Sequence, residues 1–303
     1  MFTIAHMTDP HLPMAGASLA ELFSKRILGW LSWTLRRRRS HRGPVLEAVM
    51  ADIAACKPHH IALSGDLVNI STSAEFAAAR AWLKAHAAPR DLTFVPGNHD
   101  CYTAGAESAG LRTLSPWMGG KTDQALPAFP RLRYMRNIAL ISLNSAYPAP
   151  WREASGRLGE KQLAALAEML PACAAKGLCR IVMLHHPPME SLATSPRKAL
   201  KDAAALMDIL RRHGAEIVLY GHNHRWAHVP VRTVSGTMHI LSAPSASMAP
   251  GGHKPPGGWQ LLGITRRQGT WEITVTRRQL EGRKGTMRTM AEWTLTSKDA
   301  PAS

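Results

Sequence analysis

Histidine, aspartate and asparagine are concentrated in five short blocks of this 303-residue chain, each with a glycine or a proline beside them. The blocks are DPH at residues 9–11, GDLVN at 65–69, GNHD at 97–100, HHPP at 185–188 and GHNH at 221–224. Carboxylate, carboxamide and imidazole donors without sulfur suit manganese, iron or zinc better than calcium or magnesium. The blocks therefore predict a transition-metal site.

The number of donors indicates two ions. One ion cannot take all of the candidate ligands and still keep a position open for water. Two ions about 3.5–4 Å apart, with Asp66 shared between them, would leave room for a nucleophile and for substrate oxygens. The candidate ligands are Asp9, His11, Asp66, Asn98, His185, His222 and His224.

Each block follows a short apolar or β-branched run, and Ala/Leu-rich stretches lie between the runs. The runs predict strands at 2–7, 60–64, 92–95, 138–143, 180–184 and 216–220, and the stretches predict helices at 45–56, 74–86, 159–176 and 198–213. After residue 231 only strand signals follow, at 238–241, 259–265 and 271–277. The pattern predicts an α/β fold whose site lies at the carboxyl ends of the strands.

The order and content of these blocks resemble the calcineurin-like metallophosphoesterase superfamily over residues 2–228. The resemblance implies a four-layer αββα sandwich. It also implies that Asp66 bridges two ions, with Asp9, His11 and His224 on one ion and Asn98, His185 and His222 on the other. A metal-bridging hydroxide would attack phosphorus, His99 would assist the leaving group, and Asp100 would orient the His99 ring.

Several neighbouring residues leave alternatives open. Either His185 or His186 could reach the metal, and the family's spacing before Pro187 favours His185. Cys101 follows the GNHD block and is expected to be a packed residue and not a nucleophile. Asn223, between the two histidines of GHNH, is a candidate for the substrate pocket.

An insertion at 19–42 separates the DPH block from the first long helix. It combines apolar residues at helical spacing with a run of arginines, of which Arg36 and Arg37 are candidate substrate contacts. Three interpretations compete: a helical flap packed on its own domain, an amphipathic helix on an anionic membrane surface, and a nucleic-acid contact. Nucleic acid is the least favoured partner because no recognised nucleic-acid module is present. The expected organisation is one domain at 1–280 and a C-terminal extension at 281–303, where an outer strand is one alternative.

The resemblance also bears on the substrate. The GNHD and GHNH blocks resemble those of bacterial class III cyclic-nucleotide phosphodiesterases. The insertion instead resembles UDP-2,3-diacylglucosamine pyrophosphatases, although His99 departs from their usual GNRD. We therefore expect a metal-dependent phosphodiesterase acting on a small phosphodiester such as a cyclic nucleotide. The alternatives are a membrane-surface pyrophosphatase for a nucleotide-linked lipid and, less favoured, a non-catalytic scaffold.

Composition sets the remaining limits. The 37 Lys and Arg exceed the 21 Asp and Glu by 16, which favours an anionic partner. Four scattered cysteines do not describe a disulfide framework. No segment offers the roughly 18 apolar residues of a spanning helix, and the N-terminus lacks the pattern of a secretory signal. The expected location is the cytoplasm, with contact at the inner face of the membrane as an option. The sequence does not indicate an oligomeric state.

Overall fold

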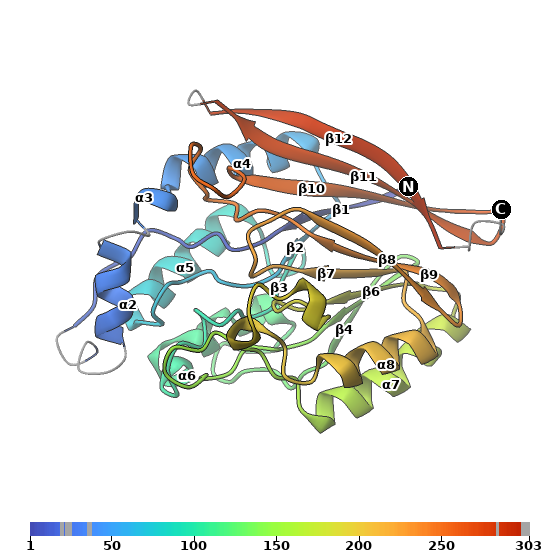
Figure 1. Cartoon of the computed structure of the whole chain (residues 1–303), viewed down its shortest axis with the longest axis horizontal. Helices are drawn as coiled ribbons and strands as arrows, with labels where there is room; N and C mark the ends of the chain where they lie inside the picture. Colours follow the sequence, from blue (N-terminus) through green and yellow to red (C-terminus); the bar gives the residue numbers. More distant parts are fainter. Residues whose placement is uncertain (19–20, 22–25, 35–37, 283–284, 298–303) are drawn as a thin grey trace.

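A computed structural model describes residues 1–18, 21, 26–34, 38–282 and 285–297. It contains two six-stranded sheets packed face to face (Figure 1). The first sheet has the order β12-β11-β10-β1-β2-β3. Its strands are β1 (Phe2–Met7), β2 (His60–Leu63), β3 (Leu92–Phe94), β10 (Gly258–Arg267), β11 (Thr270–Glu281) and β12 (Thr286–Thr296). β1, β2 and β3 are parallel, so the residues that follow them meet at one edge of the sheet.

The second sheet has the order β4-β5-β6-β7-β9-β8. Its strands are β4 (Arg131–Met135), β5 (Ile138–Ser142), β6 (Cys179–Met183), β7 (Ile217–Tyr220), β8 (Ala227–Thr233) and β9 (Gly236–Ser242). β5, β6, β7 and β9 are parallel and almost continuously buried, as strands covered on both faces must be.

Three apolar clusters lie between successive layers, which follow one another as helices, sheet, sheet and helices. The cluster between the sheets joins residues such as Ile4, Ile181 and Leu262. α4 (Gly43–Cys56) and α5 (Ser73–His86) cover the outer face of the first sheet. α7 (Glu160–Ala175) and α8 (Ala203–His213) lie together on the outer face of the second (Figure 1). The predicted αββα arrangement is therefore present.

One predicted helix begins later than expected. The sequence predicts a helix at 198–213, but α8 begins at Ala203, and 196–198 form a short 3₁₀ turn. The residues between them use their backbone groups elsewhere: Gly156 N donates to Ala199 O at 3.0 Å, and Lys201 N donates to Gly156 O at 2.8 Å. That pairing replaces the first helical turn.

The described residues of the insertion include two helices, α2 (Arg26–Ser32) and α3 (Arg38–Ser40), and end in the non-helical His41 and Arg42. Buried Arg26 anchors α2, because its guanidinium donates to Ile70 O at 3.0 Å and to Ser71 O at 2.7 Å. A Cβ on Gly29 would lie 2.5 Å from Ile70 Cγ2, so only glycine allows α2 to pack this closely. The described part of the insertion is thus packed on its own domain.

The residues expected as a C-terminal extension include β12, which pairs antiparallel with β11 at the edge of the first sheet. β11 itself continues to Glu281. Among the described residues, no helix combines the length and apolar character needed to cross a bilayer.

Candidate active site

Five of the seven candidate ligands have left-handed backbone conformations at the ends of strands. The φ angles of these five lie between 40° and 68°. Such conformations cost about 1–3 kcal/mol each for residues other than glycine and collect at functional sites. Turning the backbone in this way directs side chains from separate strand ends toward one point. The five residues are Asp9, His11, Asp66, His222 and His224.

Asp9, His11 and His224 form the first of two donor groups. The distance from His224 Nε2 to Asp9 Oδ1 is 3.0 Å, and that from His11 Nε2 to Asp9 Oδ1 is 3.9 Å. Asp66 Oδ2 lies 3.7 Å from the same nitrogen of His11. Separations of this size are those of neighbouring ligands on a single ion.

The second donor group is centred on His185. Its Nε2 lies 3.2 Å from Asn98 Oδ1, 3.3 Å from His222 Nδ1 and 3.4 Å from Asp66 Oδ2. Asp66 Oδ2 therefore faces both groups. Its position is the geometry that a carboxylate shared between two ions requires.

Hydrogen bonds from backbone groups and from one hydroxyl hold these donors in orientation. Asp9 Oδ2 accepts hydrogen bonds from Thr8 Oγ1 at 2.6 Å and from His222 N at 3.0 Å. His185 Nδ1 lies 2.7 Å from Ser64 O. Since a carbonyl only accepts, Nδ1 carries a hydrogen, and Nε2 is the ring nitrogen that faces Asp66 and Asn98.

The charges around His185 and Asp66 favour the binding of a cation. Burial would lower the pKa of His185, but the charge and hydrogen bond of Asp66 raise it to about 9. Burial opposes the ionised form of Asp66, yet His185 and His99 hold the pKa of that carboxyl well below its usual range. Two carboxylates thus stay ionised in a buried site and attract positive charge.

Close packing at two glycines supports the same assignment. A Cβ on Gly65, whose φ is +95°, would overlap the His185 ring. A Cβ on Gly97 would overlap the Asp66 carboxylate. Neither position tolerates a side chain while the donor set is in place. The donors present therefore fit two transition-metal ions in chemistry and arrangement.

His99 stands beside the donor groups. Its ring lies 5.1 Å from that of His11 and stacks on Tyr102 at 5.9 Å. His99 Nδ1 lies 2.5 Å from Asn69 O, so Nδ1 donates and the ring orientation is fixed. The backbone N of His99 donates to Asp66 Oδ1 at 2.8 Å.

The predicted role of Asp100 is wrong. Its buried carboxylate accepts four backbone N–H groups, so it is not available to the His99 ring, which Asn69 orients instead. Oδ2 accepts from Gly97 and Asp66, each at 2.8 Å. Oδ1 accepts from Leu67 at 2.9 Å and Val68 at 3.1 Å. Asp100 ties the loop after β2 to the loop after β3.

His186 lies within the second group but not at Asp66. Its Nδ1 is 2.8 Å from Ser145 Oγ, and its ring lies 4.8 Å from that of His222. Within the part of the chain that the structure describes, the buried Nε2 atoms of His186 and His222 have no hydrogen-bond partner. His185 and not His186 therefore faces the shared carboxylate. Cys101 is buried, and burial raises the pKa of its thiol, as a packing residue requires.

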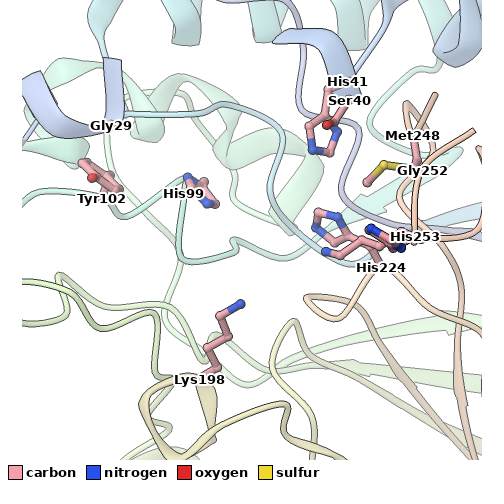
Figure 2. A pocket seen from close by; sticks show the side chains of 11 residues that line it. Gly29, Ser40, His41, His99, Tyr102, Lys198, His224, Met248, Gly252 and His253 are labelled. Carbon is pink, nitrogen blue, oxygen red and sulfur yellow. The ribbon is translucent and has the colours of Figure 1, made fainter. Parts of the chain in front are cut away.

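A cavity of about 640 Å³ opens beside the donor groups. His99 and His224 line it from the motif blocks, and Lys198 extends into it from the opposite side (Figure 2). The described residues that line it include no carboxylate. The cavity is therefore suited to an anion.

The structure does not place the other candidate substrate contacts, Asn223, Arg36 and Arg37, at this cavity. Asn223 Nδ2 donates to Leu192 O at 2.8 Å, and Asn223 is not among the lining residues. Arg36 and Arg37 lie outside the described residues. His41, which sequence reasoning missed, does line the cavity and has no motif around it that could have revealed it.

A family model described as calcineurin-like phosphoesterase matches residues 2–226. A probable cyclic nucleotide phosphodiesterase from Synechococcus sp. is 27% identical over 234 residues, 77% of this chain and 82% of that protein. A cAMP/cGMP dual specificity phosphodiesterase from Mycobacterium tuberculosis is 29% identical over 69% of this chain and 63% of its own length.

Solved structures share the fold at low sequence identity. A dimetal phosphatase from Danio rerio aligns with a TM-score of 0.60 and 13% identity over 98% of this chain and 99% of that one. A purple acid phosphatase from yellow lupin aligns with a TM-score of 0.55 and 13% identity over 99% of this chain and 54% of that one. These likenesses show the two-sheet architecture.

Proposed function

Since the chain belongs to the calcineurin-like phosphoesterase family and is a metal-dependent phosphoric ester hydrolase, we propose that it is a binuclear phosphodiesterase. One observation carries the proposal: Asp66 Oδ2 faces both His11 Nε2 and His185 Nε2, at 3.7 and 3.4 Å. Two donor groups that share one carboxylate are what a two-ion centre needs. Manganese, iron and zinc are the ions that these donors favour.

Asp9, His11 and His224 would hold one ion, Asn98, His185 and His222 the other, with Asp66 between them. Bound ions would supply positive charge against the substrate's phosphoryl oxygens and would activate water as the nucleophile. His99 would give its Nε2 proton to the leaving oxygen. Asn69 O accepts the hydrogen of Nδ1 and so holds the ring in a fixed orientation for this step.

A small phosphodiester such as a cyclic nucleotide is the proposed substrate. Both curated relatives named above are described as cyclic-nucleotide phosphodiesterases. The 640 Å³ cavity falls in the range of about 300–1,000 Å³ that small-molecule sites occupy. Lys198 would meet an anionic oxygen of the substrate across from His99.

A specific observation favours a second candidate, a pyrophosphatase for a nucleotide-linked lipid such as UDP-2,3-diacylglucosamine, working at the inner membrane surface. Ile27, Trp30 and Leu31 on α2 are exposed by 47%, 36% and 41%. Gly29 of the same helix lines the cavity. An apolar surface beside a phosphate site could receive acyl chains, with the arginine run against lipid phosphates.

Parallel assays distinguish these functions. Hydrolysis of cyclic AMP, bis-p-nitrophenyl phosphate and UDP-2,3-diacylglucosamine is measured with the metal-loaded enzyme. We expect turnover of the first two, whereas strong preference for the third would favour the lipid pyrophosphatase. No metal-dependent turnover of any would indicate a scaffold. Flotation with anionic vesicles, comparing the intact chain with a variant carrying serine at 36–39, tests membrane contact.

A further inference from the structure

His41 joins the insertion to α4 and is held rigidly beside the site. Its Nδ1 lies 2.9 Å from Ser247 Oγ and 3.3 Å from Ser245 Oγ. Ser245 Oγ in turn donates to Asp9 O at 2.6 Å. The backbone around it is also paired with the loop after β9, because Arg42 N donates to Ser247 O at 2.9 Å. Both side chain and backbone therefore fix where this ring stands.

The ring of His41 faces the first donor group. Its centroid lies 4.4 Å from that of His11 and 5.4 Å from that of His224. One ring nitrogen from each of these three histidines lies within 4.8 Å of the others. The indole of Trp33 stacks parallel to His41 at 6.5 Å, and His41 is only 7% exposed. Three imidazoles are thus gathered beside Asp9 in a buried site.

We propose that His41 is a further protein ligand of the ion held by Asp9, His11 and His224. The inference rests on the proposed two-ion centre. The contact with Ser247 assigns Nδ1 to the scaffold and Nε2 to the ion, an arrangement common for metal-binding histidines. Nitrogen ligands bind at about 2.0–2.1 Å, so two on one ion lie at most about 4.2 Å apart. The ring nitrogens of the three histidines lie within 4.8 Å of one another, which is near this limit.

The assignment gives the insertion a chemical role. None of the five motif blocks contains His41, and the segment that carries it is the insertion at 19–42. If His41 binds the ion, filling the first metal position also fixes the wall of the cavity formed by Ser40 and His41. Metal loading and cavity shape are then coupled.

The test measures metal binding directly. Wild type, His41→Ala and His41→Gln are loaded with Co²⁺, dialysed against graded chelator, and their metal content and Co²⁺ absorption spectra are recorded. We expect one of two ions to bind about 10–100-fold more weakly in both variants, with a changed spectrum. His253→Ala is the control, because His253 lines the same cavity outside the three-histidine cluster.

The outcomes separate this inference from the proposed function. Two ions bound with wild-type affinity and spectrum in both folded variants would overturn the role of His41 alone. A rise in KM without any change in metal binding would also overturn it, since His41 would then contact substrate. A wild-type protein that binds no ions would overturn the proposed function and this inference with it. Circular dichroism confirms folding, and His41→Gln serves if the alanine variant does not fold.

Discussion

The carboxylate of Asp100 offers a quantitative test of how the two loops that carry the proposed ligands Asp66 and Asn98 are held together. In Asp100→Asn one carboxylate oxygen becomes an NH₂ group, which cannot accept a hydrogen bond. Each oxygen of Asp100 now serves two backbone N–H donors, so two buried donors lose their acceptor. An unsatisfied buried donor costs about 1–3 kcal/mol, which gives a predicted destabilisation of about 2–6 kcal/mol.

The assay is urea unfolding of the metal-free protein, followed by circular dichroism, with metal content measured separately. The backbone N–H groups bound to Asp100 include those of Asp66 and Gly97, and Asn98 follows Gly97. Because Asp66 and Asn98 are proposed metal ligands, metal binding should weaken together with stability. Asp202→Asn is a matched control. Asp202 Oδ2 accepts from both Leu158 N at 2.9 Å and Gly159 N at 2.7 Å, and Oδ1 only shares the Leu158 N donor at 3.1 Å, so an asparagine can keep both donors paired with its single oxygen.

A decrease of less than about 1 kcal/mol in the free energy of unfolding of Asp100→Asn, together with normal metal binding, would contradict this role of Asp100. That result would mean that the loop after β2 and the loop after β3 are held together by other contacts. An equally strong destabilisation of Asp202→Asn would also contradict it, because the cost of the substitution would then not depend on whether backbone donors lose their acceptor.

Three further predictions concern catalysis, binding and pH. His99→Ala should lower kcat by about 10²–10⁴-fold with metal content unchanged, and loss of metal would instead make His99 a ligand. Lys198→Ala should raise KM about fivefold at unchanged kcat, because it removes one charge contact with the substrate of about 1 kcal/mol. Lys201→Ala, outside the cavity, should leave KM unchanged. Equal effects of the two substitutions on KM would contradict the role of Lys198. Burial lowers the pKa of His60 from 6.5 to about 3, so as pH falls below 6.5 the unfolded chain takes up a proton that the folded chain refuses. His60 should therefore lower the free energy of unfolding by about 2 kcal/mol between about pH 7 and pH 5. This contribution should disappear in His60→Gln, which urea unfolding of both proteins at the two pH values measures.

Much of the fold could be predicted because the strands that carry the blocks are buried apolar runs. β1 has the predicted bounds, and β7 differs by one residue at its start. The edge strands β4 and β8 were missed because they are only partly buried and mix polar with apolar residues, and Pro230 interrupts the pattern of β8. The start of α8 depended on pairing with a distant segment, which local periodicity does not reveal.

The candidate site divides in the same way. Residues within motif blocks could be named from the sequence, and the structure brings all seven candidate ligands together. The acceptor role of Asp100 could not be predicted, since it depends on which backbone donors the folded loops present. His41 comes from an irregular junction and reaches the site only through tertiary pairing with Ser247.

The most direct test of a binuclear centre is to titrate the metal-stripped protein with Mn²⁺ while following hydrolysis of bis-p-nitrophenyl phosphate. The shared position of Asp66 predicts that turnover is absent without metal and reaches its maximum only when two ions are bound per chain. Full activity with a single ion, or activity that survives complete removal of metal, would contradict the two-ion centre.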